Sequence, residues 1–134
     1  MMNAEQVRAV LSTLSPTQEK VDLAVKTAIE TVRPTSVIVF GSWARGEARW
    51  DSDVDLAVVL PDSAEPALPE IRRMLRRKLS EVPMSIDLVL ATEGHMEQFR
   101  DSVNSIYYNI LKDGKVAYEQ HASDASADSG HQSR

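Results

Sequence analysis

The segment "DVDLAVVL", residues 53–60, combines two carboxylates with an apolar run. Asp53 and Asp55 are two residues apart, so in a strand both side chains leave the same face, where like charges repel and burial without partners is costly. Mg²⁺ takes oxygen ligands and is usually held by one or two carboxylates together with substrate phosphates. The pair therefore predicts a metal site at the start of a strand.

A candidate phosphate site precedes the carboxylates by ten residues. Gly41 and Ser42 follow the β-branched run "SVIVF", at a point where the chain must turn. Such a turn presents backbone N–H groups to phosphate oxygens, and the Ser42 hydroxyl adds another donor. Arg45 in the same loop is a further candidate for contact with a phosphate. These residues predict a phosphate-binding site.

A third carboxylate, Asp87, belongs to the run "MSIDLVLA". In this predicted strand Asp87 leaves the face opposite to Ile86 and Leu88. Adjacent strands lie only ~4.8 Å apart, so Asp87 would join Asp53 and Asp55 if the two strands were neighbours. Two metal ions ~3.5–4 Å apart could then clamp the attacking and leaving oxygens of an in-line displacement.

Several regular elements must position these residues. Ser15 is expected to cap a helix through residue 32, with Pro16 in its first turn and Gln18 at the capping-box spacing. A Pro-rich loop should lead into an amphipathic helix whose apolar residues share one face. The predicted elements are helix 15–32, strand 36–40, strand 53–60, loop 61–70, helix 71–82 and strand 84–91. Together they predict an α/β fold, with a small mixed twisted sheet and helices mainly on one face.

The C-terminal part of the chain is expected to contain one or two helices, a turn at Asp113-Gly114 and a short final strand. The last residues, 121–134, are rich in Ser, Ala and Asp and contain no large apolar side chain. Because such a segment cannot offset its ordering entropy, it is predicted to be a disordered tail. The domain is therefore expected to span residues 1–120.

Composition limits the class of protein. The chain has 134 residues, a net charge of −5 and no cysteine, which excludes disulfides, thiolate zinc sites and cysteine nucleophiles. It lacks a signal-peptide pattern and any apolar run of ~18 residues, so we expect a cytoplasmic protein without membrane contact. The run "RRMLRRK" fills the polar side of a predicted helix, and a solvated face is favoured there over nucleic-acid binding.

Taken together, "GS", ten residues, then "DVD", with "ARG" after the serine and "SIDLV" downstream, resemble the polymerase-β-type nucleotidyltransferase superfamily. More narrowly, they resemble the minimal nucleotidyltransferases, or MNT proteins, which are antitoxins encoded beside HEPN toxins. The resemblance runs from about Thr35 to Leu90.

By this resemblance, Gly41 and Ser42 contact the triphosphate of ATP, and Asp53 and Asp55 ligate both Mg²⁺ ions. Asp87 would ligate one ion and help to activate the acceptor hydroxyl, and all three carboxylates would be catalytic. The resemblance implies transfer of AMP from ATP, with a tyrosine of a partner HEPN toxin as the expected acceptor.

Two other functions stay open from the sequence. One is adenylyl transfer to a small molecule of the aminoglycoside kind. The other is a contact-only antitoxin with a vestigial nucleotide site. Trp43 and Trp50 flank the candidate site, and the sequence does not decide whether they stack on adenine or pack on the core.

Overall fold

A four-stranded mixed sheet forms the centre of the protein, which we describe from a computed structural model over residues 1–120. The strands are β1 (Ser36–Phe40), β2 (Val54–Leu60), β3 (Ile86–Thr92) and β4 (Lys115–Glu119). Their order across the sheet is β3-β2-β1-β4. The predicted tail, 121–134, lies outside the described residues.

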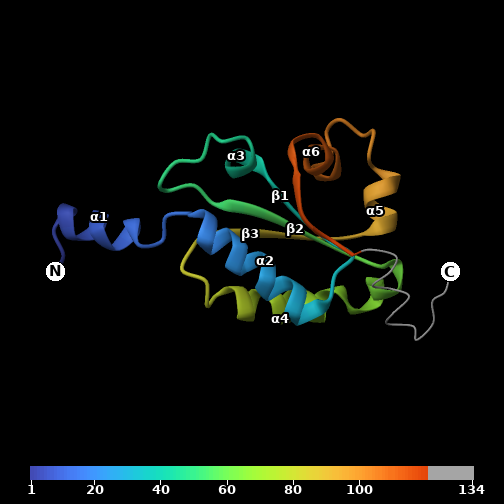
Figure 1. Ribbon diagram of the computed structural model, residues 1–134, viewed down its shortest axis with the longest axis horizontal. Helices are drawn as coiled ribbons and strands as arrows, with labels where there is room; N and C mark the ends of the chain where they lie inside the picture. The colour runs from blue at the N-terminus through green and yellow to red at the C-terminus, as the bar shows by residue number, and fades with distance from the viewer. Residues whose placement is uncertain (121–134) are drawn as a thin grey trace.

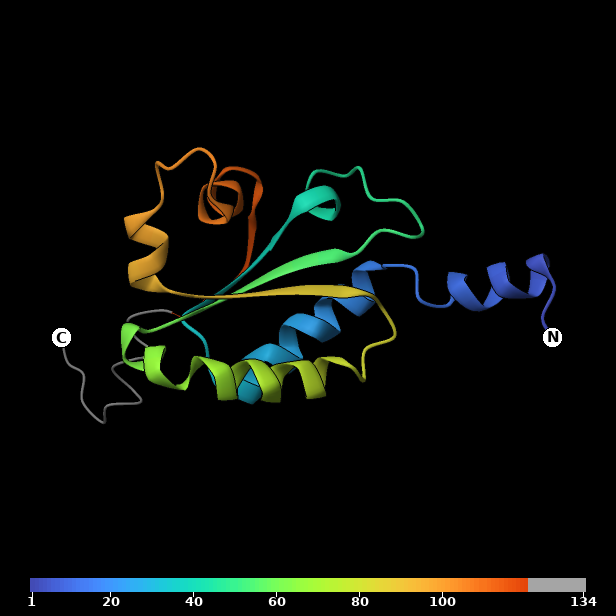
Figure 2. The ribbon, with the colours of Figure 1, turned by 180° about the vertical axis from the view of Figure 1, so that it is seen from behind.

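Helices cover both faces of this sheet (Figures 1 and 2). The helices are α1 (Ala4–Ser12), α2 (Gln18–Val32), α3 (Gly41–Ala44), the 3₁₀ helix η1 (Asp62–Ala67), α4 (Leu68–Leu79), α5 (Glu93–Gln98) and α6 (Ile106–Asp113). The two longest, α2 and α4, lie side by side on one face, and α3, α5 and α6 lie on the other, whereas the sequence predicts helices mainly on one face. The expected mixed α/β architecture is confirmed.

Two apolar clusters hold the layers together because the strands alternate their side chains between faces. Leu56, Val58 and Leu88 pack with Leu75 of α4 on the face that α2 and α4 cover. Ala57, Val59 and Ala91 pack with Ile110 of α6 on the other face. The sheet is therefore buried on both sides, which explains why β2 is apolar at nearly every position.

The strand directions decide which ends of the strands meet. β1 runs antiparallel to β2 and β4, whereas β2 and β3 are parallel. A parallel pair needs a crossover connection, and here η1 and α4 supply it. The N-terminal ends of β2 and β3 therefore lie at the same end of the sheet, with Asp55 paired to Asp87.

Three details differ from the sequence predictions. Thr17, not Ser15, caps α2, because its Oγ1 accepts a hydrogen bond from the Lys20 amide at 3.2 Å. Ser15 lies outside the helix, because the first backbone hydrogen bond of α2 runs from the Val21 amide to the Thr17 carbonyl oxygen. The helix after the Pro-rich segment begins at Leu68 rather than residue 71, and η1 precedes it.

The third difference is α1, a helix that the sequence analysis did not anticipate. It projects from the body of the protein instead of joining either helix layer (Figures 1 and 2).

Among residues 1–120, no helix is long and apolar enough to cross a membrane.

Candidate active site

Asp55 and Asp87 lie on the same face of the sheet, directly opposite each other on β2 and β3. The alternation of each strand fixes this arrangement. Val54 and Leu56 point into the cluster beneath α2 and α4, so Asp55 points to the opposite face. Leu88 of β3 also points into this cluster, so its neighbour Asp87 points to the same face as Asp55. The structure thus brings together two of the three carboxylates that the sequence analysis singled out.

The electrostatics of Asp55 reflect this crowding. The pKa of Asp55 is raised to about 6. Burial is the largest cause of this shift, and the negative charges of Asp87 and Asp53 add to it. Hydrogen bonding with the Asp87 side chain is a further cause that raises the pKa of Asp55. A cation placed between these groups would relieve the repulsion between the two carboxylates.

Gly41 lies directly against the Asp55 carboxylate. A Cβ atom added to Gly41 would stand 1.8 Å from Asp55 Oδ2, and the φ of +76° at Gly41 is one that L side chains rarely adopt. Glycine is thus required on two independent grounds. The contact also joins the predicted phosphate-binding turn to the predicted metal ligands, although ten residues of chain separate Ser42 from Asp53.

Ser85 is a residue that the sequence analysis did not identify. Its Oγ donates a hydrogen bond to Asp53 Oδ1 at 2.5 Å, and its carbonyl oxygen accepts from the Val54 amide at 2.9 Å. Both bonds link the residue before β3 to the start of β2. A hydroxyl two residues before Asp87 is a weak sequence signal, because only the parallel register places it beside Asp53.

Arg45, a predicted phosphate ligand, is held by two acidic side chains. Its Nε donates to Glu47 Oε1 at 2.9 Å, and its Nη1 lies 3.4 Å from Asp113 Oδ2 on α6. The hydrogen bond with Glu47 is the largest cause that raises the pKa of Arg45. Arg45 also lies close enough to lower the pKa of Asp55 slightly, which places it beside the carboxylates.

The carboxylates of Asp53, Asp55 and Asp87 offer the oxygen ligands that a Mg²⁺ ion prefers. The repulsion between the Asp55 and Asp87 carboxylates marks a position where positive charge is favourable. Within residues 1–120, however, no group of three His, Asp or Glu side chains is spaced to hold a metal ion. Asp55 and Asp87 lie opposite each other, while the Asp53 carboxylate accepts a hydrogen bond from Ser85.

The two tryptophans have different environments. Trp43, in α3, packs against the cluster beneath α2 and α4, whereas Trp50 is exposed. In the basic run of α4, Arg73, Arg76 and Lys78 are exposed while Leu75 and Leu79 are buried, as expected for a solvated helix face.

Neither of two cavities in the described part of the chain is lined by the carboxylates. A cavity of about 710 Å³ lies between α2 and β4, and another of about 550 Å³ lies near α5 and the end of β4. The edge that carries Asp55 and Asp87 therefore presents its carboxylates outside both cavities.

A nucleotide-dependent transferase is the class that this arrangement defines, with a glycine turn and opposed carboxylates at one edge of a mixed sheet. Residues 19–116 match the family model described as a nucleotidyltransferase domain, and the chain belongs to this family. No match was found among curated proteins.

A solved structure supports the fold. It is a Sulfolobus solfataricus protein assigned as a nucleotidyltransferase, and it matches with a TM-score of 0.54 at 19% identity. The match covers 89% of this chain and 91% of that one. At this level of identity the likeness concerns the fold alone, and it supports the expected mixed α/β fold of a nucleotidyltransferase.

Substitution of Gly41 by alanine tests the contact with Asp55. Gly46→Ala is the matched control, because Gly46 has a φ of +75° but no atom within 4 Å of an added Cβ. Gly46→Ala should cost about 1 kcal/mol from the left-handed backbone alone. Gly41→Ala should cost at least about 1 kcal/mol more, because Asp55 must move. Urea unfolding measures both, and equal losses would show that Asp55 does not press on Gly41.

The pKa of Asp55 predicts a pH-dependent stability. Because the folded value of about 6 exceeds the ordinary 3.8, ionised Asp55 destabilises the metal-free protein, and stability falls as pH rises through this window. Asp55→Asn should therefore stabilise the protein at pH 8 by about 1 kcal/mol, allowing for partial solvent screening.

The Asp55→Asn gain should shrink at pH 4, where the parental side chain is largely protonated. Asp51→Asn, in the loop before β2, provides a control with the same change of charge. Thermal melting across pH 4 to 8 measures the difference. A gain that is independent of pH, or equal in both variants, would contradict the assigned environment of Asp55.

Proposed function

We propose that this chain transfers AMP from ATP to a hydroxyl group, with Mg²⁺ held by Asp53, Asp55 and Asp87. The observation that carries the proposal is the contact of Gly41 with the Asp55 carboxylate, opposite Asp87. It puts the turn expected to bind phosphates beside the acids expected to bind the cation. Membership of the nucleotidyltransferase family supports the same reaction class.

In the proposed reaction, the acceptor oxygen bonds to the α-phosphorus of ATP. The bond between that phosphorus and the oxygen bridging to the β-phosphate breaks, and pyrophosphate leaves. The acceptor proton would pass to the carboxylate of Asp87, which lies opposite Asp55 on the neighbouring strand. Bound Mg²⁺ would supply neutralisation of the triphosphate charge.

The residues of this chain contribute mainly position and charge. Gly41 lets the backbone approach Asp55 closely, and Ser42 offers its hydroxyl to a phosphate oxygen. Ser85 holds one oxygen of Asp53 and so limits the orientations of that carboxylate. Catalysis of this type relies on holding the reactants in line rather than on a covalent intermediate.

The proposed acceptor is a tyrosine of a HEPN-type partner protein, which gives the chain an antitoxin role. The position of the carboxylates supports a protein acceptor, because neither described cavity encloses them. A small drug-like acceptor is typically buried over 70–90% of its surface, as a rough expectation. Here another protein would have to complete the walls around the acceptor.

Removal of the proposed metal ligands tests the reaction itself. Asp53→Asn combined with Asp55→Asn should abolish transfer of label from α-³²P-ATP while the protein stays folded, because a like-charge repulsion is removed. Circular dichroism and melting verify the fold, and Asp51→Asn serves as the control with full activity. Label transfer at the parental rate by the double variant would place the metal site elsewhere.

A labelling experiment tests the acceptor. Incubation with labelled ATP, Mg²⁺ and a co-expressed HEPN protein encoded beside this chain should place AMP on a tyrosine of that protein. Replacement of that tyrosine by phenylalanine should remove the label, and aminoglycosides offered instead should stay unlabelled. Efficient labelling of an aminoglycoside would favour the small-molecule function. Tight binding of the HEPN protein without label on any acceptor would favour a contact-only antitoxin.

A further inference from the structure

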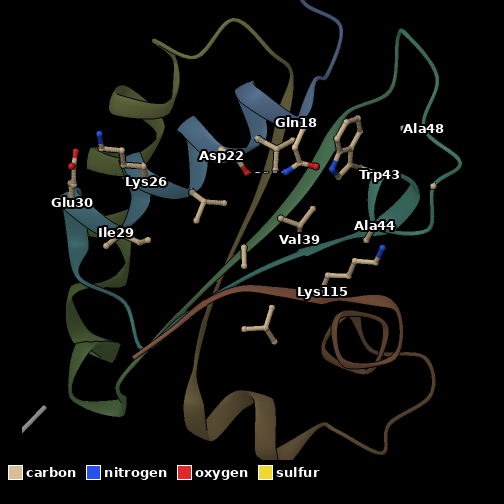
Figure 3. Close-up of a pocket in the computed structure, with 15 residues that line it drawn as sticks. Gln18, Asp22, Lys26, Ile29, Glu30, Val39, Trp43, Ala44, Ala48 and Lys115 are labelled. Carbon is tan, nitrogen blue, oxygen red and sulfur yellow. Dashed lines mark hydrogen bonds between the residues drawn. The ribbon is translucent and has the colours of Figure 1, made fainter. Parts of the chain in front are cut away.

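The cavity of about 710 Å³ lies on the face of the sheet opposite to the carboxylates. We call it the α2–β4 cavity, because Val21, Val25 and Ile29 of α2 line one wall and Val116 and Ala117 of β4 line another. Figure 3 shows these walls, with Trp43 at one end and Glu30 at the other. Its lining is largely apolar, and Val116 is 59% exposed, so the cavity presents apolar surface to solvent.

The N-terminal segment also exposes apolar side chains. Val7 in α1 is 41% exposed, and Leu14 after the helix is 44% exposed. Figures 1 and 2 show that α1 projects away from both helix layers. The described part of the chain therefore has an apolar cavity and, away from it, a helix that joins neither helix layer in these views.

The linker between α1 and α2 holds α1 in its projecting position. Lys20 Nζ donates hydrogen bonds to the carbonyl oxygens of Thr13 and Ser15, at 2.7 and 2.8 Å. Pro16 restricts Ser15 to extended geometry, and Thr17 caps α2. To reach the cavity of its own chain, α1 would have to fold back beside α2 and break these bonds. A second chain can reach the cavity without breaking them.

The dimensions and charges of the two parts agree. At a rise of about 1.5 Å per residue, the nine residues of α1 are about 13.5 Å long, which fits within the roughly 19.5 Å of α2 that lines the cavity, from Gln18 to Glu30. The cavity rim carries the acids Asp22 and Glu30 and the bases Lys26 and Lys115. A helix with one Glu and one Arg, as in α1, meets no net repulsion there.

We propose that α1 of a second copy of this chain fills the α2–β4 cavity, and that two copies exchange α1 reciprocally. Exchange of an identical element is a low-cost route to a symmetric dimer, because both contacts are formed at once. The C-terminal segment 121–134 is a poor alternative occupant, because its sequence offers no large apolar side chain. The proposal is independent of the proposed reaction.

Engineered cysteines provide a direct test, because the chain has no cysteine of its own. One copy carries Val7→Cys and a differently tagged copy carries Val116→Cys; the two are mixed and mildly oxidised. A disulfide-linked heterodimer is expected as the main product. Leu23→Cys replaces Val116→Cys in the control, because Leu23 is an exposed α2 residue that does not line the cavity. Equal linkage in the control would overturn the proposal.

A second measurement distinguishes exchange from folding back within one chain. The full chain with both Val7→Cys and Val116→Cys should give linked dimers, whereas a linked monomer would show that α1 fills its own cavity and would overturn the proposal. Sedimentation of the cysteine-free protein should show a dimer that Val7→Glu weakens by about tenfold or more, as expected for loss of a buried apolar side chain. A monomer at all concentrations, or a dimer unaffected by Val7→Glu, would also overturn it.

Discussion

β2 and β3 run parallel with Asp55 opposite Asp87, and the candidate site depends on this register. Two carboxylates in this position repel each other, so their own interaction does not hold the strands in place. The apolar residues between them do. Val54 and Leu56 on β2, and Leu88 on β3, are buried in the same cluster. A slip of one residue would turn these side chains outward and the carboxylates into the core.

The crossover helix α4 explains how a short chain maintains this register. Leu75 and Leu79 are buried against the sheet, at 0% and 5% exposure, which anchors the connection between β2 and β3. Their neighbours Arg76 and Lys78 remain exposed. The basic run therefore has a structural explanation, since it is the outer side of the helix that makes a parallel pair possible.

The sequence was sufficient to predict the elements whose pattern is local. The alternation around Asp87 and the apolar stripe of α2 correctly placed strands, helices and buried faces, because periodicity reflects which side meets the core. The pairing of Asp55 with Asp87 needed one further fact, that β2 and β3 are neighbours, which no local pattern contains. Ser85 was missed for the same reason, since its hydrogen bond to Asp53 crosses between strands.

The cap of α2 and the position of α1 also differ from the sequence predictions. Ser15 and Thr17 are both good capping residues; in the structure Thr17 caps the helix, while the Ser15 carbonyl oxygen accepts a hydrogen bond from Lys20 Nζ. The position of α1 could not be predicted from helical pattern either, because a helix that packs on its own domain and one that packs on another chain have the same apolar period.

The four-residue helix α3 connects the two faces of the protein. Its first residue, Gly41, lies against the Asp55 carboxylate, while Trp43 and Ala44 line the α2–β4 cavity. Hydrogen bonds close this turn on itself, from the Arg45 amide to the Gly41 carbonyl and from the Glu47 amide to the Ser42 carbonyl. These bonds tie Gly41 and Ser42 to the residues after Trp43, so a helix packed against Trp43 on one face would contact the same short turn that meets Asp55 on the other. An exchanged α1 and the candidate active site would thus be coupled through one short, well-bonded turn.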